Sequence, residues 1–348
     1  MKSKAIGLMS GTSLDGLDIC FAEFEKYDNK WQFKIIEAET ICYPENWEKA
    51  LRNSLHLSSE NLLALNSEYG FYLGKTVKTF IEDKKITDID LIASHGHTVF
   101  HQPHKKFTLQ IGDGRGIKLQ TNIPVIYDFR SQDVLMGGNG APLVPIGDEL
   151  LFSQYDGCLN LGGFSNISFK KAQKRIAFDI CAVNIVLNKI SQQLGKSFDE
   201  NGDSARKGSV DSNLLEKLNN LEFYHHQHPK SLGIEFCNHY IFPLLENVDS
   251  LTALATFTEH AAIQIFKILN ENRLKKVLFT GGGTYNSYLI EKIKYNTSCE
   301  IIIPDKSIID FKEALIFAFM GVLRINNEVN VLSSATGSLQ DHSSGIIA

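Results

Sequence analysis

The chain has 348 residues, of which 43% are hydrophobic, and its formal net charge at pH 7 is −5. This length exceeds what one hydrophobic core usually supports, so the composition predicts a globular protein with two domains. No cluster of basic residues is dense enough to neutralise a nucleic-acid backbone, and no apolar run approaches the roughly 20 residues of a membrane helix.

The six cysteines are scattered and lack C-x-x-C spacing. Such thiols fit a reducing cytoplasm better than the disulfide framework of a secreted protein. The apolar run after Lys2 and Lys4 is short and ends in polar residues, unlike a signal peptide. We therefore expect a cytoplasmic protein that binds neither membranes nor nucleic acids.

The stretch 5–18 predicts a buried strand, a tight hydroxyl-rich turn and the start of a second strand. Gly11 and Gly16 let a ligand approach the backbone, and successive exposed N–H groups bind anions. Asp15 and Asp18 add carboxylates that suit a hydrated Mg2+, with Asp15 acting through water. An ordinary hairpin turn is the alternative, but two later glycine-rich turns favour phosphate binding.

The first half of the chain is predicted to begin with an antiparallel meander followed by helices. We expect strands at residues 5–9, 18–25 and 31–43, and helices at residues 44–57 and 59–84. Short buried strands are then expected at residues 90–94, 108–111 and 125–129. Each of these ends in polar residues, and open α/β sheets place their ligands at such strand ends.

The block 137–145 contains too much glycine and proline for a helix or a strand interior. We interpret it as the crossing into the second domain. A plain linker is the alternative, but Arg130 and Asp133 directly precede the block and favour the rim of an active site.

The second half restarts with the same pattern of strand, glycine turn and strand at residues 158–168. A third strand is expected at residues 175–178, ending in Asp179. The remaining expectations are helices at 183–194, 213–221, 237–245, 251–271, 286–295 and 311–324, and strands at 276–280 and 300–303. The two similar halves suggest two lobes that clamp a nucleotide between matching hairpins.

In this order, the motifs resemble the anhydro-N-acetylmuramic acid kinase family, within the superfamily of actin, sugar kinases and heat-shock ATPases. The matching blocks are residues 9–18, 94–101, 109–113, 128–130 with Asp133, 137–145, 160–163 with Asn166, 281–283 with Asn286, and 313–315. The resemblance implies an α/β fold of two actin-like lobes, each a mixed sheet flanked by helices, with ATP in the cleft between them. Residues 1–130 and 312–348 would form the N-terminal lobe, and residues 131–311 the C-terminal lobe.

The resemblance also implies a reaction. ATP, with Mg2+, would phosphorylate 1,6-anhydro-N-acetylmuramic acid while water opens the anhydro ring, giving N-acetylmuramic acid 6-phosphate and ADP in murein recycling. By analogy with the family, the protein would form a homodimer. The alternatives are a related kinase of an ordinary sugar and a nucleotide-binding sensor without catalysis.

The resemblance places nucleotide contacts in three segments. These are Gly11, Thr12, Ser13, Leu14, Asp15, Gly16, Leu17 and Asp18 in the first loop, Gly162, Gly163 and Asn166 in the second hairpin, and Gly281, Gly282 and Gly283 beside the adenosine. Asp179 matches the catalytic aspartate of the family, which takes a proton from the attacking water. A helix-capping aspartate is the alternative.

We assign sugar contacts to His95, Arg130, Asp133 and Glu313. The guanidinium fork of Arg130 suits the lactyl carboxylate or a phosphate. Glu313 is expected at the start of the final helix, where it would bind a sugar hydroxyl or simply be a favourable first-turn charge. The spacing of His95 and the histidines that follow it fits no standard zinc site.

The chain departs from the family pattern directly after Asp179. The usual run there is Thr-Gly-Pro-Gly-Asn, whereas this chain has Ile-Cys-Ala-Val-Asn at residues 180–184. The loss of glycine is expected to reduce backbone freedom and to add bulk near the base. This change would reshape the sugar pocket or alter substrate preference.

Overall fold

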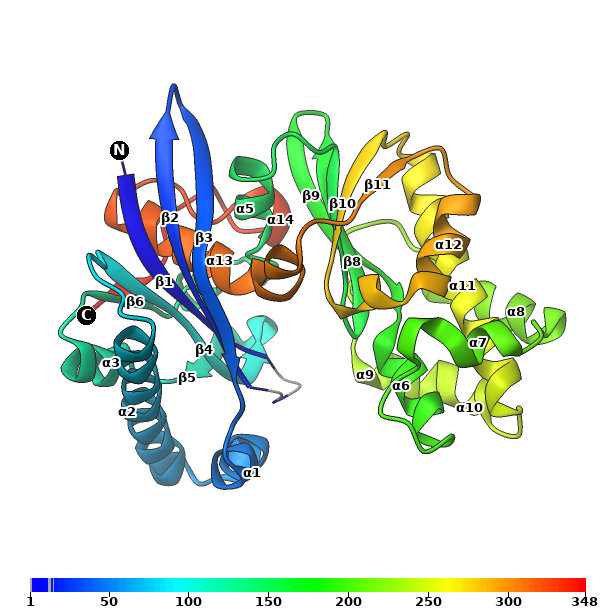
Figure 1. Ribbon diagram of the computed structural model, residues 1–348, viewed down its shortest axis with the longest axis horizontal. Coiled ribbons are helices and arrows are strands. Elements are labelled where there is room, and N and C mark those ends of the chain that lie inside the picture. The colour runs from blue at the N-terminus through cyan, green and yellow to red at the C-terminus, as the bar shows by residue number, and fades with distance from the viewer. Residues whose placement is uncertain (1, 12–13, 15) are drawn as a thin grey trace. The chain divides into compact units, whose positions relative to one another are not determined.

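The computed structural model describes residues 2–11, 14 and 16–348 (Figure 1). The chain forms two compact units: Met1–Phe152 with Phe311–Ala348 is unit 1, and Ser153–Asp310 is unit 2. The boundaries at 152/153 and 310/311 differ from the predicted 130/131 and 311/312. The block 137–145 is therefore not the crossing between domains.

Residues 131–152 belong to unit 1 because their side chains are held there. The carboxylate of Asp133 accepts a hydrogen bond from Thr336 Oγ1 at 2.7 Å. Asp148 forms a buried ion pair with Lys312, and the ring of Phe152 packs 5.3 Å from that of Phe33. No local sequence pattern reveals these partners, since they lie far away along the chain.

Seven strands of the described residues form the sheet of unit 1, in the order β12-β6-β4-β1-β2-β3, with β5 paired to β4. Their bounds are β1 (Lys2–Ser10), β2 (Leu17–Tyr27), β3 (Lys30–Ile41), β4 (Leu91–Gln102), β5 (Phe107–Ile111), β6 (Val125–Tyr127) and β12 (Ile346–Ile347). The predicted meander of the first three strands is confirmed. The strand predicted at 90–94 runs on as β4, because residues beyond Ser94 pair with both β1 and β5.

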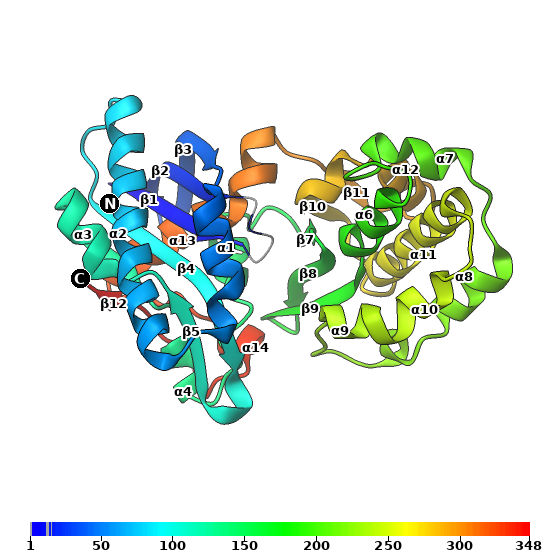
Figure 2. The ribbon, with the colours of Figure 1, turned by 90° about the horizontal axis from the view of Figure 1, so that it is seen from below.

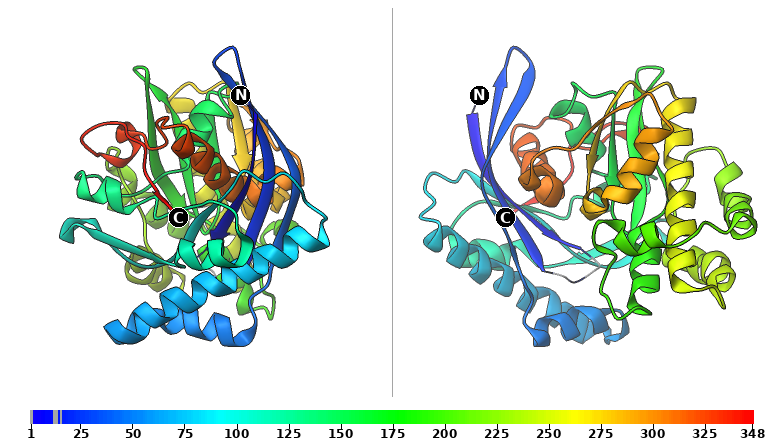
Figure 3. Two further views of the ribbon diagram at one scale, coloured as in Figure 1. Left: turned by 90° about the vertical axis from the view of Figure 1, so that its left-hand side faces the viewer. Right: turned by 45° about the vertical axis from the view of Figure 1, so that its right-hand side comes forward.

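Helices cover both faces of this sheet (Figure 3). They are α1 (Glu45–Asn53), α2 (Ser59–Asp83), α3 (Gly114–Thr121), α4 (Ser131–Leu135), α5 (Pro145–Leu150), α13 (Lys306–Ile325) and α14 (Ser333–Thr336), with short 3-10 turns η1 (Ser54–His56) and η2 (Pro103–Lys105). Ile6 and Leu8 of β1 join the core beneath α1, α2 and α3. The alternate residue Gly7 meets the α13 backbone at Ala314, where a Cβ atom would clash. Because side chains alternate along β1, position 7 faces α13. The close approach of the α13 backbone leaves no room there for a side chain.

Five strands of the described residues form the sheet of unit 2, in the order β11-β10-β7-β8-β9. Their bounds are β7 (Gly157–Leu161), β8 (Phe164–Lys171), β9 (Lys174–Ala182), β10 (Lys276–Thr280) and β11 (Glu300–Ile302). In both units an antiparallel three-strand meander is extended by two parallel strands, as β3-β2-β1-β4-β6 and β9-β8-β7-β10-β11. This shared topology confirms the predicted similarity of the two halves.

Several helices of unit 2 pack around α11 (Ser250–Glu271), which itself packs against β9 of the sheet (Figure 2). The other helices are α6 (Asn184–Gln192), α7 (Asp203–Lys207), α8 (Ser212–Asn219), α9 (Ile234–Phe236), α10 (Phe242–Leu245) and α12 (Ser287–Tyr295), with short turns η3 (Glu200–Gly202), η4 (Glu222–His225), η5 (Cys237–Ile241) and η6 (Gly282–Tyr285). Asn286 caps α12, which lies within the helix predicted at 286–295, and accepts a hydrogen bond from Leu289 N at 3.0 Å. The mixed α/β class, with two sheets flanked by helices, is confirmed.

Candidate functional site

The first predicted nucleotide loop joins β1 to β2. Leu14 N donates a hydrogen bond to the Gly11 carbonyl oxygen at 3.3 Å, which closes a turn. The side chains of Leu14 and Leu17 are buried in the core of unit 1, so both anchor the loop by packing. Three further residues of the predicted set lie outside the described residues: Thr12, Ser13 and Asp15.

The end of this loop is held against β3. A Cβ atom on Gly16 would lie 2.7 Å from the Ile41 carbonyl oxygen, so this close approach requires glycine. Asp18 follows in β2, where its carboxylate accepts a hydrogen bond from Thr40 Oγ1 at 2.6 Å.

β4 places His95 beside Arg130 in unit 1. Arg130 donates from Nε to His95 Nε2 at 2.9 Å and from Nη1 to the Gly140 carbonyl oxygen at 2.6 Å. His95 Nδ1 donates to the Gly96 carbonyl oxygen at 2.9 Å, so the ring is neutral. Burial and the neighbouring guanidinium lower the pKa of His95 well below its usual value. Burial also lowers the pKa of Arg130 to about 10.

Glu313 is a half-buried carboxylate that acts electrostatically on Arg130. Burial raises the pKa of Glu313, and the charges of Arg130 and Lys312 oppose that shift. Because α13 begins at Lys306, Glu313 lies about two turns inside the helix. The first-turn interpretation is therefore wrong. Within the described part of the chain Glu313 accepts no hydrogen bond, which leaves its oxygens for a ligand.

Asp133 has a different role from the predicted sugar contact. It is fully buried, and its carboxylate accepts hydrogen bonds from Gly140 N and Thr336 Oγ1, both at 2.7 Å. With both donors inside the fold, Asp133 holds the turn whose Gly140 carbonyl receives Arg130. We therefore correct its assignment from sugar contact to positioning residue.

The second predicted nucleotide hairpin joins β7 to β8 in unit 2. The Gly163 carbonyl oxygen accepts a hydrogen bond from Val183 N at 2.8 Å, and the Gly162 carbonyl oxygen accepts one from Asn184 N at 3.3 Å. The turn is thus fixed to the start of α6.

The third predicted nucleotide segment packs against this hairpin. A Cβ atom on Gly281 would lie 2.5 Å from Asn160 Oδ1, and one on Gly283 would lie 2.8 Å from Leu161 Cβ. A Cβ atom on Gly282 would meet nothing within 4 Å. Two of the glycines therefore permit close packing of the two segments, while Gly282 leaves its backbone open to a ligand.

Asp179 lies inside β9, opposite Asn166 of β8. Asp179 N donates a hydrogen bond to the Lys230 carbonyl oxygen at 3.0 Å, and Leu232 N donates to Asp179 Oδ2 at 2.8 Å. Asp179 Oδ1 has no hydrogen-bond donor among the described residues. Burial raises the pKa of Asp179, although the Leu232 hydrogen bond opposes the shift. One carboxylate oxygen is thus held while the other stays uncommitted.

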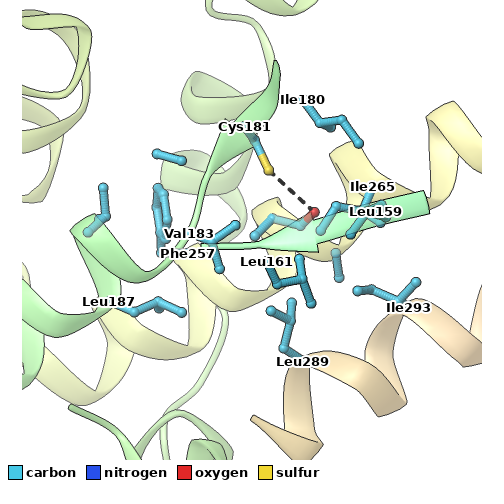
Figure 4. Close-up of a cluster of buried hydrophobic side chains, with 14 of the residues drawn as sticks. Leu159, Leu161, Ile180, Cys181, Val183, Leu187, Phe257, Ile265, Leu289 and Ile293 are labelled. Atoms are coloured by element: carbon cyan, nitrogen blue, oxygen red, sulfur yellow. Dashed lines mark hydrogen bonds between the residues drawn. The ribbon is translucent and has the colours of Figure 1, made fainter. Parts of the chain in front are cut away.

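The strand predicted to end at Asp179 continues to Ala182, and Val183 is the N-cap of α6. The helix-cap alternative for Asp179 is therefore wrong. The added side chains of residues 180–183 are buried in the core of unit 2 (Figure 4). β-Branched and apolar residues favour a longer strand here, which the family's glycines do not.

The groups that hold these side chains were not predictable from the sequence. Leu232 lies 53 residues from Asp179, and Gly140 acts only through its backbone. No local motif signals either contact. Tyr43, which hydrogen-bonds Ser10 at the end of β1, was also missed.

The sequence profile described as anhydro-N-acetylmuramic acid kinase matches residues 3–348. The chain belongs to the anhydro-N-acetylmuramic acid kinase family. Proteins named anhydro-N-acetylmuramic acid kinase from Francisella tularensis subsp. novicida (strain U112) and Clostridioides difficile (strain 630) are 33% and 34% identical to it. Each alignment covers 96% of this chain and 95% of the relative. The family prediction, and with it the prediction of a kinase, is confirmed.

Two solved structures with low sequence identity also align. Component A of (R)-2-hydroxyglutaryl-CoA dehydratase from Acidaminococcus fermentans has a TM-score of 0.47 and 11% identity, covering 91% of this chain and 96% of that one. A ROK family glucokinase from Streptomyces griseus, in complex with glucose and AMPPNP, has a TM-score of 0.38 and 9% identity, covering 86% and 94%.

Membership of this kinase family supports ATP as the phosphoryl donor. The described residues contain no group of three or more His, Cys, Asp or Glu side chains able to hold a metal. In the same described part of the chain, no helix combines the length and apolar character needed to cross a membrane.

Proposed function

We propose that this chain transfers the γ-phosphoryl group of ATP to 1,6-anhydro-N-acetylmuramic acid while water opens the anhydro ring. The products are N-acetylmuramic acid 6-phosphate and ADP, which places the reaction in the recycling of cell-wall murein. Family membership supports the substrate. One observation supports the chemistry: Leu232 N holds one carboxylate oxygen of Asp179, and the other oxygen is uncommitted.

In this proposal Asp179 Oδ1 is the general base. It accepts a proton from the water that attacks C1 of the sugar. The bond between C1 and O6 breaks, and the electron pair left on O6 attacks the γ-phosphorus as the bond to ADP breaks. The Leu232 hydrogen bond fixes the carboxylate so that the same oxygen faces the water in each turnover. The proton on Asp179 then passes to solvent.

We propose that the loop 11–18, the hairpin carrying Gly162, Gly163 and Asn166, and the glycines 281–283 bind ATP. Mg2+ would neutralise charge on the phosphates, with Asp18, and Asp15 through water, as the carboxylates proposed to hold it. In the same proposal, Arg130 binds the lactyl carboxylate or a phosphate, and Glu313 binds a sugar hydroxyl. His95 was expected to contact the sugar, but both of its ring nitrogens are hydrogen-bonded within unit 1, so we propose instead that it orients Arg130. A cytoplasmic location and a homodimer are proposed by analogy with the family.

The test combines Asp179→Asn with isotope labelling. Asp179→Asn should abolish product formation while ATP affinity, measured by calorimetry, changes little. Asp203→Asn, an exposed aspartate in the same unit, is the matched control and should keep full activity. In water enriched in oxygen-18, the wild-type product should carry the label at C1. Turnover of the reducing sugar but not the anhydro sugar would indicate an ordinary kinase, and ATP binding without ADP formation would indicate a sensor.

A further inference from the structure

Four polar side chains lie in a row at the end of β1. Tyr43 donates a hydrogen bond from its hydroxyl to Ser10 Oγ at 2.9 Å, and Tyr43 OH lies 2.6 Å from Tyr69 OH. Ser10 Oγ lies 3.2 Å from His97 Nδ1. These four residues come from β1, the connection after β3, α2 and β4, and Ser10 pairs with His97 in register. The row therefore links three separate elements to the residue that precedes the first nucleotide loop.

The direction of the row follows from counting protons. Tyr43 has one hydroxyl proton and gives it to Ser10, so Tyr69 must donate to Tyr43. Ser10 then has its own proton to give, and His97 Nδ1 is its acceptor. Burial lowers the pKa of His97 to about 4, so the ring is neutral at pH 7. A neutral ring that accepts at Nδ1 carries its single proton on Nε2.

The opposite arrangement is less favourable. If His97 Nδ1 donated to Ser10, the serine proton would have to turn to Tyr69 OH, which acts electrostatically with Ser10 but forms no hydrogen bond with it among the described residues. A poorly paired buried donor costs free energy. Ser10 is only 2% exposed. His95, two residues away on β4, makes the contrast clear: its Nδ1 must donate because the Gly96 carbonyl can only accept.

We infer that Tyr43 and Ser10 fix His97 in the Nε2–H tautomer, so that His97 binds ligand by donating a hydrogen bond to an oxygen atom. His97 Nε2 has no partner within the described part of the chain, and the residue stands beside the start of the loop assigned to the phosphates. The inference rests on the proposed function for the identity of that oxygen, which belongs to an ATP phosphate or to the sugar. His97 is then a binding residue, and Tyr43 is a positioning residue.

The first test reads the tautomers directly. Long-range proton–nitrogen spectra of the histidine rings in the full chain should show His97 protonated at Nε2 and His95 protonated at Nδ1. Tyr43→Phe removes the donor to Ser10 and should turn the His97 signals into a mixture of tautomers. Tyr72→Phe is the matched control, since Tyr72 belongs to the same aromatic cluster but is outside the row. A wild-type His97 protonated at Nδ1, or unchanged signals in Tyr43→Phe, would overturn the inference.

The second test measures ligand binding. His97→Leu should raise KM by about tenfold for the ligand that supplies the oxygen, while His97→Gln, whose amide still donates, should recover most of the loss. A rise in KM for ATP identifies a phosphate oxygen, and a rise for the sugar identifies a sugar oxygen. Unchanged KM values for both would refute the binding role. If the anhydro sugar is not turned over at all, the proposed function fails. The spectra then still show the tautomer of His97, and the ATP affinity of His97→Leu still tests its binding role.

Discussion

Breaking the buried ion pair between Lys312 of α13 and Asp148 of α5 should strongly destabilise that part of unit 1. The two charged atoms lie 2.6 Å apart, and the side chains are only 6% and 4% exposed. Coulomb's law with an effective dielectric constant of about 20 gives roughly 6 kcal/mol of attraction at this separation. Desolvation offsets much of it, but Lys312→Met removes the cation that lies 2.6 Å from the buried Asp148 carboxylate. We expect this variant to lose about 3–5 kcal/mol of unfolding free energy.

Denaturant titration followed by tryptophan fluorescence suits this test, because Trp31 and Trp47 both lie in unit 1. Lys312→Met with Asp148→Leu removes both charges and should recover most of the loss, since apolar replacements of a buried pair are often neutral. Lys49→Met is the matched control: Lys49 pairs with Glu45 on the surface, so the cost should stay below about 1 kcal/mol. A double variant as unstable as Lys312→Met alone would refute the reasoning.

Four further predictions concern the proposed site and the residues next to it. Arg130→Lys keeps the charge but not the fork that reaches both His95 and Gly140, so kcat/KM for the anhydro sugar should fall by about tenfold or more in steady-state assays. Because burial raises the pKa of Asp179 and a base must be deprotonated, the rate should fall as pH drops through that raised value; a rate that holds down to pH 3.8 would contradict this. The same rise in pKa means that ionised Asp179 destabilises the fold at neutral pH. Asp179→Asn should therefore unfold at a higher denaturant concentration than wild type. The difference between the two unfolding midpoints should disappear as pH falls from the raised pKa to 3.8. Cys181→Gly should lower the free energy of unfolding by about 2 kcal/mol, measured by circular dichroism.

Elements defined by their own side-chain pattern were predictable from the sequence. The meander of β1, β2 and β3, the long helix α2 and the capped helix α12 carry local signals of period two, period 3.6 and an N-cap. The ends of β4 and β9 were not predictable in this way. Residues such as His97 are polar, yet they continue a strand because β1 and β5 supply partners on both sides.

The features of the candidate site also divide into those that could be predicted from the sequence and those that could not. Glycine turns and the aspartate at position 179 could be found from residue type and order, because phosphate binding and proton transfer demand particular groups. The contacts that orient those groups could not, since Leu232 acts through its backbone 53 residues from Asp179. Asp133 was misassigned for a related reason, because its partner Thr336 is 203 residues away in the chain. The sequence does not show that Asp133 is buried, and burial prevents it from contacting the sugar.

The structure gives residues 180–183 a different role from the one expected from the sequence. Bulk replacing glycine next to the base was expected to reshape the sugar pocket, yet the side chains of Ile180, Cys181 and Val183 are at most 2% exposed and enter the core. Cys181 Sγ lies 3.2 Å from Ser165 Oγ and 3.9 Å from the Ala261 carbonyl oxygen of α11. Cys181→Gly would empty this space and free the backbone, so the loss should appear in stability, with kcat/KM for the anhydro sugar kept within about twofold after correction for folded protein. Unchanged stability with a new preference for the reducing sugar would instead assign the run to the pocket.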